Sequence, residues 1–315
     1  MHSAIIIPTY NRAHLIGRAI KASLKQTVED KLVVVVDDGS TDHTQAACAP
    51  FFGDPNFLYI RLGRNLGTAA AKNVALALVP FGAVTFHDSD DVPHRDKVLR
   101  QVRTLERDDL IADPCLPWHI NNKSQSAGGQ ANIDLVLTAH KHIGADGTSA
   151  RIARTLSLVD DFFPGLQFGA GPLGDWVLIN SGLFRRSILA KAGGFCNGVE
   201  EDRDLRNRAL MHGANVWFID TPLLTKFEQA DSLTAHEDTG YRSERRVKDR
   251  ADVWQSVIDW KASGNAPVVP ISFPDIVLAF VSNSARVRIA DDIPIEDKTF
   301  RRLNWEFDRL SIVRS

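Results

Sequence analysis

Short apolar runs alternate with helical stretches along the first third of this chain, and this alternation limits the folds that it can adopt. The run from Leu32 to Val36 is apolar at every position, as in strands that are buried on both faces of a sheet. Similar runs occupy residues 3–7, 57–60 and 81–86, and segments with helical periodicity lie between them. Such an order predicts βαβ crossovers and an α/β fold with a mostly parallel, Rossmann-like sheet flanked by helices.

Three carboxylates, Asp88, Asp90 and Asp91, follow the last of these strands within four positions. Their mutual repulsion is costly unless a cation balances it. Carboxylate oxygens suit a hard divalent ion, so the cluster predicts a Mn²⁺ or Mg²⁺ site. Ligands of open α/β sheets also bind just outside the carboxyl ends of the strands, which is where this cluster falls. The alternative is an acidic cap on the following helix.

The same edge of the predicted sheet gathers the polar groups that follow the other strands. Residues 8–10 close the first strand, and Asp37 and Asp38 close the second. Lys72 lies in an alanine-rich helix from about residue 68 to residue 78. Because parallel strands end at one edge, we expect these groups to lie near the acidic cluster.

The middle of the chain supports fewer predictions. Residues 133–138 indicate irregular or antiparallel strands, and the glycine-rich residues 168–174 form either a mobile loop along a substrate cleft or a turn-rich connection. A strand is expected at residues 176–181, followed by a short helix. Acidic residues then open a helix over residues 200–212, where they complement the helix dipole or serve catalysis, and a strand follows at 216–219.

Helical patterns dominate the sequence after about residue 231. Val247, Ala251, Trp254 and Ile258 fall on one face of an amphipathic helix. Further helices are expected at about residues 275–290 and 298–312.

Composition bounds the partners and the location of the protein. Thirty-seven basic and 39 acidic residues leave a net charge of -2, so no overall charge favours nucleic acid. Three widely spaced cysteines are typical of reduced thiols, and the apolar residues 5–7 are too few for a signal peptide. No apolar run reaches the roughly 18 residues of a spanning helix, so we expect a cytoplasmic protein without a transmembrane segment. Basic residues at 242–246 and 301–302 leave peripheral membrane contact open, although interleaved acids favour solvated helix faces.

Six motifs, in order, resemble the family 2 glycosyltransferases, which are inverting enzymes of the GT-A fold. They are Ile7-Pro8-Thr9-Tyr10-Asn11-Arg12, Val36-Asp37-Asp38-Gly39-Ser40-Thr41-Asp42, Asn65-Leu66-Gly67 with Lys72-Asn73, Asp88-Ser89-Asp90-Asp91, Gly193-Gly194-Phe195, and Glu201-Asp202-Arg203-Asp204-Leu205. The resemblance implies a GT-A domain at 1–230, with a nucleotide-binding half at 1–110 and an acceptor-binding half at 111–230. The helical C-terminal extension, residues 231–315, carries no family motif and would form an acceptor lid, a homodimer surface or a brace for the sheet.

The resemblance also implies a nucleotide-sugar donor, with a UDP-sugar favoured, that lies across the strand ends. Residues 8–10 would wall the base and Asp38 would bond its edge. Lys72, where the family often has Arg, would sit near the base or the diphosphate, and Asp88 would bind the ribose hydroxyls. The full donor-binding set implied is Pro8, Thr9, Tyr10, Arg12, Asp37, Asp38, Asn65, Lys72, Asp88 and Ser89.

The remaining site residues follow from the same resemblance. Asp90, helped by Asp91 and Asp88, would hold the divalent ion that neutralises the diphosphate leaving group. Asp202, with Glu201 beside it, would take the proton from the acceptor hydroxyl as this oxygen attacks the anomeric carbon opposite the leaving nucleotide. A single displacement of this kind would invert the anomeric centre, and the resemblance implies a glycosyltransferase of the hexosyltransferase class.

One departure from the family concerns the third metal ligand. Many relatives carry a His before Ser-x-Ser or Ser-x-Thr after the last strand of the domain, and this chain has none in register. His236 follows nearby, either as a metal ligand or as an ordinary surface histidine. The Gln-x-x-Arg-Trp pattern of processive polysaccharide synthases is also missing, so we expect a non-processive enzyme.

Two rival functions fit part of the sequence. The stretch from Asp88 to Val92 matches the Asp-x-Asp-x-Val pattern of haloacid-dehalogenase-like phosphatases, in which Asp88 would be the nucleophile beside Mg²⁺. That motif normally follows the first strand of its domain, whereas three strand-helix units precede it here. A catalytically inactive glycosyltransferase fold that serves as a binding subunit is the second rival, and the intact carboxylate clusters argue against it.

Overall fold

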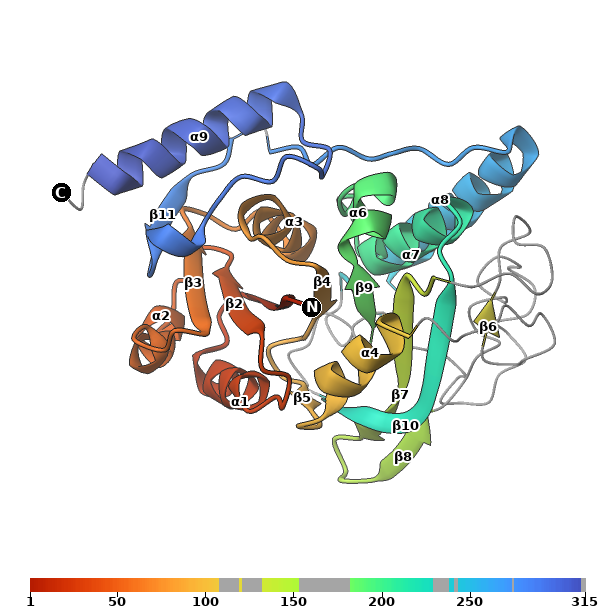
Figure 1. Ribbon diagram of the computed structural model, residues 1–315, viewed down its shortest axis with the longest axis horizontal. Coiled ribbons are helices and arrows are strands. Elements are labelled where there is room, and N and C mark those ends of the chain that lie inside the picture. The colour runs from red at the N-terminus through yellow and green to blue at the C-terminus, as the bar shows by residue number, and fades with distance from the viewer. Residues whose placement is uncertain are drawn as a thin grey trace.

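The computed structural model describes residues 1–107, 119–120, 132–152, 182–228, 238–240, 243–273 and 275–312. Its centre is a mixed sheet whose described strands follow the order β11-β3-β2-β1-β4-β9-β7-β10-β5, with β6 paired to β10 and β8 paired to β7. Helices cover both faces of this sheet (Figure 1). The α/β class predicted from the sequence is therefore confirmed.

The N-terminal part follows the predicted alternation of strands and helices. Its elements are β1 (Ser3–Thr9), α1 (Ala13–Leu24), β2 (Lys31–Asp37), α2 (Thr44–Cys48), a 3-10 helix (Ala49–Phe51), β3 (Phe57–Leu62), α3 (Thr68–Leu78) and β4 (Ala83–Phe86). The four strands run parallel, and Ile6 of β1 lies opposite Val34 of β2 and Phe86 of β4. Their carboxyl ends therefore meet at one edge of the sheet.

The second part mixes strand directions, so the sheet as a whole is mixed and not mostly parallel as the sequence predicted. Its elements are β5 (Val92–Pro93), α4 (Lys97–Leu105), β6 (His119–Ile120), β7 (Leu135–Ile143), β8 (Ser149–Ile152), β9 (Leu183–Arg185), α6 (Arg186–Ala192), α7 (Glu201–Met211) and β10 (Val216–Phe227). β9 is antiparallel to β4 and β7, whereas β7 is parallel to β10 and antiparallel to β8. The expected strand at 176–181 and the glycine-rich residues 168–174 lie outside the described residues.

β10 continues well beyond residue 219, where the sequence predicted its end. The pairing of β10 with β7 shifts register on both sides of Pro222. Proline has no N–H to donate to a ladder, and a bulge lets a strand pass such a residue without ending. The longer strand carries Lys226 toward the carboxyl edge of the sheet, where it lies beside Asp88.

Two hydrophobic cores lie on opposite faces of the sheet. Ile5 and Ile7 of β1 belong to the core that α1, α2 and α4 cover, while Ala4 and Ile6 belong to the core under α3, α6, α7 and α9. Successive side chains of a strand point to opposite faces, so a strand between two helical layers must be apolar at every position. This requirement explains the unbroken apolar runs in the sequence.

The C-terminal segment corrects one prediction. α8 (Glu244–Ser263) and α9 (Asp297–Ile312) are helices as expected, but residues 275–290 are not a helix: they contain the strand β11 (Leu278–Val281) and a 3-10 helix (Ser284–Arg286). β11 pairs antiparallel with β3, which would otherwise present an open edge. A short apolar run has no period that separates a strand from a helix, so this pairing partner decided the outcome. The domain boundary near residue 230 stays a prediction, and no described helix is long and apolar enough to span a membrane.

Candidate active site

Asn11 ties the loop after β1 to the loop after β2. It adopts a φ of 52°, a left-handed conformation that Asn tolerates better than most residues, and its Oδ1 accepts a hydrogen bond of 2.8 Å from the Thr41 backbone N–H. Pro8 and Thr9 are buried at the end of β1, and Tyr10 is 40% exposed. The Thr9 hydroxyl has no hydrogen-bond partner among the described residues. This arrangement leaves a polar and an aromatic side chain at the edge where a base was predicted to lie.

The side chain of Asp37 is buried and hydrogen-bonded within the protein. Its fully buried carboxylate accepts hydrogen bonds from the Tyr59 hydroxyl at 2.5 Å and from the Ser40 backbone N–H at 2.8 Å. Gly39 precedes Ser40 with a φ of 73°, and a Cβ there would lie 2.5 Å from the backbone carbon of Arg64. Asp37 therefore shapes the turn, and its role toward a donor stays a prediction.

Asp38 holds the neighbouring turn. Its two oxygens accept hydrogen bonds from the backbone N–H groups of Leu66 and Gly67, each at 2.7 Å. Burial raises the pKa of Asp38 to about 6, although these two bonds act in the opposite direction. The exposed Asn65 is positioned just before this turn. The predicted contact of Asp38 with a base edge stays a prediction.

Lys72 joins the two predicted halves of the site. Its side chain is almost completely buried in α3, and its Nζ lies 3.0 Å from Glu201 Oε1 at the start of α7. Burial alone would lower the pKa of Lys72, but the negative charges of Glu201, Asp202 and Asp88 raise it. Lys72 is therefore a fixed cation between the acidic cluster and the candidate base.

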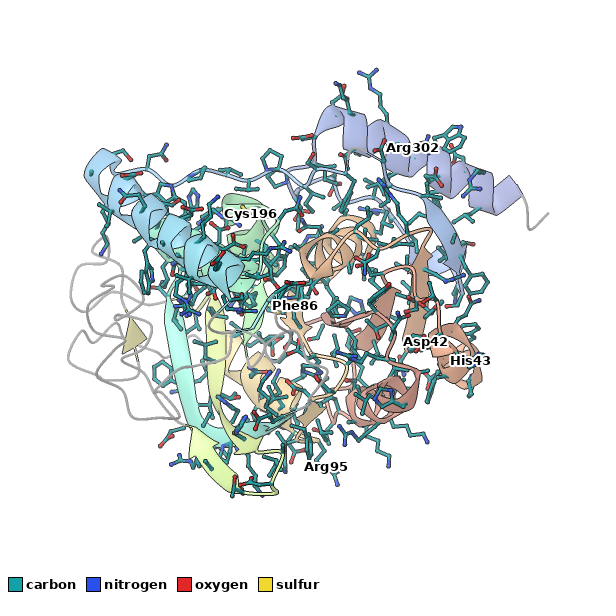
Figure 2. All side chains as sticks on the ribbon, turned by 180° about the vertical axis from the view of Figure 1, so that it is seen from behind. Asp42, His43, Phe86, Arg95, Cys196 and Arg302 are labelled. Atoms are coloured by element: carbon teal, nitrogen blue, oxygen red, sulfur yellow. The ribbon has the colours of Figure 1, made fainter. Side chains whose placement is uncertain are left out.

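The Gly193-Gly194-Phe195 motif supports this lysine. The Lys72 ammonium lies 4.9 Å from the centre of the Phe195 ring, which packs edge-on against Phe86 at 5.0 Å. Phe86 lies near the middle of the molecule (Figure 2). Asn73, next to Lys72, accepts a hydrogen bond from the Phe195 N–H at 2.7 Å and donates one to the Phe195 carbonyl at 2.8 Å. Lys72 and its neighbour Asn73 thus both contact Phe195, and these contacts fix the lysine and the aromatic ring relative to each other.

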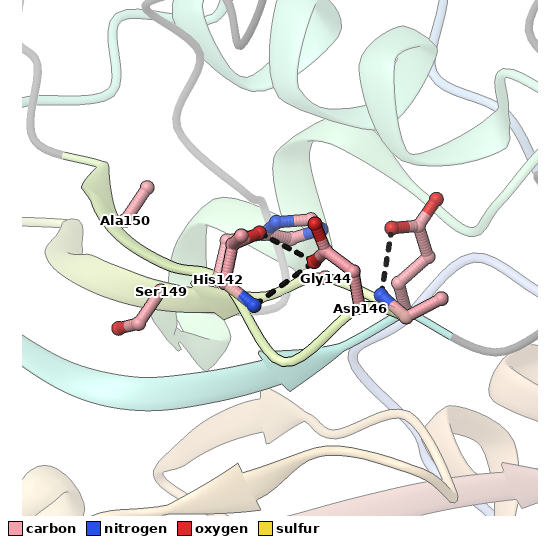
Figure 3. Close-up of a pocket in the computed structure, with 8 residues that line it drawn as sticks. His142, Gly144, Asp146, Ser149 and Ala150 are labelled. Atoms are coloured by element: carbon pink, nitrogen blue, oxygen red, sulfur yellow. Dashed lines mark hydrogen bonds between the residues drawn. The ribbon is translucent and has the colours of Figure 1, made fainter.

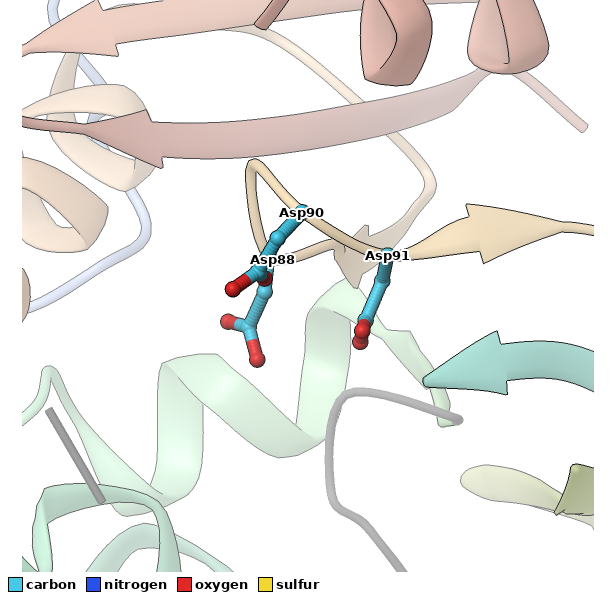
Figure 4. Close-up of side chains that lie close together, drawn as sticks. All are labelled: Asp88, Asp90 and Asp91. Carbon is cyan, nitrogen blue, oxygen red and sulfur yellow. The ribbon is translucent and has the colours of Figure 1, made fainter. Parts of the chain in front are cut away.

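The three predicted metal ligands come together in the loop between β4 and β5. One oxygen from each of Asp88, Asp90 and Asp91 can lie within 4.8 Å of the others, and Figure 4 shows the carboxyl groups pointing to one side of the loop. Burial and the charge of Asp88 raise the pKa of Asp90, and burial above all raises that of Asp91. Burial and the crowding of negative charge therefore disfavour three ionised carboxylates at this position.

The donor set fits a hard divalent cation. Asp91 is fully buried, and neither of its carboxylate oxygens has a hydrogen-bond partner among the described residues. A buried carboxylate without a partner is costly, and a divalent ion with oxygen ligands would relieve that cost. Lys226 offers partial compensation, because its Nζ lies 3.6 Å from Asp88 Oδ2. Arg18 fixes the loop by donating a hydrogen bond of 2.8 Å to the Asp90 carbonyl.

A network of buried polar side chains lies at the end of β4, next to the acidic cluster. The Lys97 ammonium donates to Thr85 Oγ1 at 2.8 Å and lies 3.1 Å from His87 Nε2, while His87 Nδ1 lies 3.2 Å from Ser23 Oγ. Burial lowers the pKa of Lys97 to about 7 and, together with the charge of Lys97, holds that of His87 well below its ordinary value. This network fixes the end of β4, and the acidic cluster follows directly after it in the sequence.

The candidate base lies at the N-terminus of α7. Asp202 Oδ1 accepts a hydrogen bond of 2.8 Å from the Arg203 backbone N–H. Burial and the neighbouring charge of Glu201 raise the pKa of Asp202 to about 6, while Lys72 opposes the shift. A carboxylate with this pKa is ionised near neutral pH and is basic enough to accept a proton. The geometry therefore suits a general base, and this role of Asp202 stays a prediction.

Three further residues, Ser89, Arg12 and His236, were predicted to belong to the site. Ser89 is buried between two members of the acidic cluster, and the backbone N–H of the half-buried Arg12 donates to Thr44 Oγ1 at 3.0 Å. His236 lies outside the described residues. The donor roles of Ser89 and Arg12, and the metal-ligand role of His236, stay predictions.

A separate cavity of about 430 Å³ lies at the β7–β8 hairpin (Figure 3). Its lining includes His142, Asp146 and Glu228, and Asp146 Oδ1 accepts hydrogen bonds from the Thr148 hydroxyl and backbone N–H. None of the predicted site residues that the structure describes lines this cavity. We therefore do not place the donor there.

Sequence reasoning missed Lys226 and the structural role of Asn73. The Asn73 bond to Phe195 joins residues 122 positions apart, and Lys226 reaches Asp88 only because β10 is longer than predicted. The position of Asn73 beside Lys72 in a family motif could have indicated its importance. Lys226 had no local signal, because a lysine near the end of a strand is commonplace.

A mixed sheet with helices on both faces, an acidic cluster beyond β4 and a carboxylate pair at the start of α7 define the GT-A class of nucleotide-sugar glycosyltransferases. The family model of glycosyl transferase family 2 matches residues 4–153, and this match supports membership of that family. An uncharacterized glycosyltransferase of Rickettsia conorii is 33% identical over 122 residues, which are 39% of this chain and 20% of that protein. The match thus spans about a fifth of the length of this relative.

Two solved structures share the fold. TarS of S. aureus in complex with UDP-GlcNAc has a TM-score of 0.56 at 18% identity, over 84% of this chain and 73% of that one. The mannosyltransferase PcManGT from Pyrobaculum calidifontis, in complex with GDP-Man and Mn²⁺, has a TM-score of 0.50 at 21% identity, over 85% of this chain and 66% of that one. At these identities the likeness establishes the GT-A-like fold, whose sheet and flanking helices this chain shares.

Proposed function

We propose that this chain is an inverting, metal-dependent and non-processive hexosyltransferase that moves a sugar from a UDP-sugar to an acceptor hydroxyl. The observation that carries the proposal is the bridge by Lys72, which contacts Glu201 at 3.0 Å and is electrostatically coupled to Asp88 and Asp202. In this proposal Lys72 lies between the acidic cluster, where the metal and the donor diphosphate would bind, and the carboxylate of the candidate base Asp202. The comparison proteins support the class, because TarS was solved with UDP-GlcNAc and PcManGT with GDP-Man and Mn²⁺.

In the proposed reaction the acceptor oxygen attacks the anomeric carbon while the bond from that carbon to the diphosphate oxygen breaks. Asp202 takes the proton of the acceptor hydroxyl, and the electron pair of the broken bond leaves with the nucleotide diphosphate. Asp90 and Asp91, with Asp88, would hold Mn²⁺ or Mg²⁺, which when bound neutralises the leaving diphosphate. Lys72 adds a fixed positive charge between the two centres and orients Glu201 beside the base.

The two rivals have less support. The phosphatase pattern at Asp88 follows the fourth strand of the sheet, in a stretch that the family 2 model covers. The inactive binding subunit requires decay of a carboxylate cluster, and both clusters are intact. A cytoplasmic location, peripheral membrane contact and a homodimer stay predictions.

Calorimetric titration with UDP, GDP, dTDP and CDP tests the proposal, each with Mn²⁺ and again with excess EDTA. We expect UDP to bind only with the metal, and Asp90→Ala to abolish this metal-dependent binding because it removes a ligand. Asp291→Ala is the matched control, since Asp291 is exposed and far in sequence from the cluster. Equal UDP binding by the Asp90→Ala protein with Mn²⁺ and with EDTA would contradict the metal role. Binding of none of the four would contradict the donor site.

A further inference from the structure

Glu200, the residue before α7, is a buried carboxylate held by three arginines. It is 4% exposed, and its Oε2 accepts a hydrogen bond of 2.7 Å from Arg203 Nε. Its Oε1 accepts from Arg246 Nη1 and Arg250 Nη2, each at 3.1 Å. Burial alone would raise the pKa of Glu200, but the charges of Arg203, Arg250 and Arg246 hold it below its ordinary value. Glu200 is therefore an ionised anchor point.

Two of the three arginines come from a distant element. Arg246 and Arg250 lie one turn apart on α8, and α8 makes a further contact between them: Asp249 Oδ2 accepts a hydrogen bond of 2.9 Å from the Val199 N–H. Arg246 also donates from Nε to the Thr239 carbonyl at 2.7 Å. Two successive residues before α7 are thus bonded to one face of α8.

The linker after α8 makes a further contact, with the glycine turn that follows α6. The Gly194 N–H donates to the Val269 carbonyl at 2.8 Å, and Gly193 forms an isolated parallel bridge with Val269. The C-terminal segment therefore contacts both the Phe195 turn under Lys72 and the residues directly before Glu201 and Asp202. A helix that served only as a surface brace would have no need for ion pairs with a buried carboxylate at this point.

We propose that Arg246 and Arg250 are positioning residues that act through Glu200 to hold the N-terminus of α7, and with it Asp202, in its reactive place. The inference rests on the proposed function, because that function makes Asp202 the base. It assigns a role in the reaction to α8, which no family motif covers. Displacement of a reacting group by about 1 Å can cost about a hundredfold in rate, so loss of this clamp would lower turnover more than substrate binding.

The first test measures the clamp itself by hydrogen–deuterium exchange. We expect Arg246→Met/Arg250→Met to accelerate exchange at amides 199–204 by about tenfold or more, with the strands β1 to β4 unchanged. Arg245→Met is the matched control, because Arg245 is exposed on the same helix and should leave exchange unaltered. Unchanged exchange at 199–204 in the double variant would overturn the proposal, and so would an increase of equal size across the whole sheet, because the arginines would then stabilise the fold in general and not α7 in particular.

The second test measures turnover with UDP-GlcNAc, whose slow hydrolysis places water in the position of the acceptor. We expect the double variant to keep its UDP affinity with Mn²⁺ but to lose at least about tenfold in kcat. Glu200→Gln should lower kcat in the same direction, and adding Arg250→Met to Glu200→Gln should cost less than the two separate losses combined. Full additivity, or wild-type kcat in the double variant, would overturn the role of Glu200 as the link.

The two tests separate failure of the clamp from failure of the proposed function. If the wild-type protein hydrolyses no UDP-GlcNAc and binds no UDP, the proposed function fails, and the exchange result still decides whether α8 holds α7. If the wild-type protein is active and the variants equal it, the function stands and the clamp fails.

Discussion

The Nζ atom of Lys72 lies 3.0 Å from Oε1 of Glu201, and the two residues come from positions 129 apart in the sequence. One belongs to α3, in the part of the fold predicted to bind the nucleotide, and the other opens α7, which carries the candidate base. The contact therefore couples the two predicted halves of the site directly.

Replacing Lys72 should change the pH dependence of the reaction. Asp202 must be ionised to accept a proton, so activity should fall as the pH drops through its pKa of about 6. Lys72 lowers that pKa, and Lys72→Met should therefore move the acid limb of the rate profile about one pH unit higher. Rates measured from pH 5 to pH 9 test this, with Lys248→Met as an exposed control. An acid limb at the wild-type position would separate Lys72 from the base.

Asp202→Asn should remove catalysis and spare donor binding. The amide cannot accept the acceptor proton, and general bases typically contribute at least about a hundredfold to the rate. We expect kcat to fall by at least that factor, while calorimetry with UDP and Mn²⁺ shows little change. Asp252→Asn, on the exposed surface of α8, serves as the control. Loss of UDP binding in Asp202→Asn would mean that the base lies elsewhere.

Lys226→Gln should tighten binding of Mn²⁺ in the absence of nucleotide. The Lys226 ammonium lies 3.6 Å from Asp88 Oδ2 and competes with a metal for the negative charge of the cluster. Removing one cation at this distance is worth about 1 kcal/mol even in a water-like dielectric, or about fivefold in affinity. Electron paramagnetic resonance of free Mn²⁺ measures the change, and Lys248→Gln is the control. Weaker binding in Lys226→Gln would indicate that Lys226 supports the site in another way.

Gly193→Ala should destabilise the fold far more than Gly264→Ala. Both glycines have a positive φ, of 81° and 71°, so each substitution puts an alanine in a backbone conformation that costs at least about 1 kcal/mol. At Gly193 the new Cβ would also overlap the Val269 carbonyl oxygen, whereas nothing lies within 4 Å at Gly264. We expect Gly193→Ala to lower the free energy of unfolding by about 3 kcal/mol or more. Urea titration measures both, and equal losses would contradict the close packing of the linker.

The sequence predicted those parts of the fold that local patterns determine. Unbroken apolar runs predicted the strands β1 to β4, helical periodicity predicted α1 and α3, and the acidic cluster lies where it was expected, after β4. The failures share another cause. β11 was taken for a helix because its short apolar run has no diagnostic period, and only the open edge of β3 decides its state.

The candidate site divides in the same way. Asp88, Asp90 and Asp91 are neighbours in sequence and could be found together, and one oxygen of each can lie within 4.8 Å of the others. The bridge from Lys72 to Glu201 and the grip of α8 on Glu200 join distant segments. No spacing along one chain can reveal such pairs, because they exist only once the sheet has brought α3, α7 and α8 together.

The pairing of β11 with β3 also has a consequence for how the protein is made. Residues 57–62 leave the ribosome long before residues 278–281, so during synthesis the outer edge of the sheet waits for a strand encoded more than 200 residues later. Until that strand arrives, the main chain of β3 can pair with any extended polypeptide, including the same segment of a second nascent chain. Release of a product that stops before residue 278 would make this exposure permanent, and a message truncated there would encode an aggregating protein rather than a smaller enzyme.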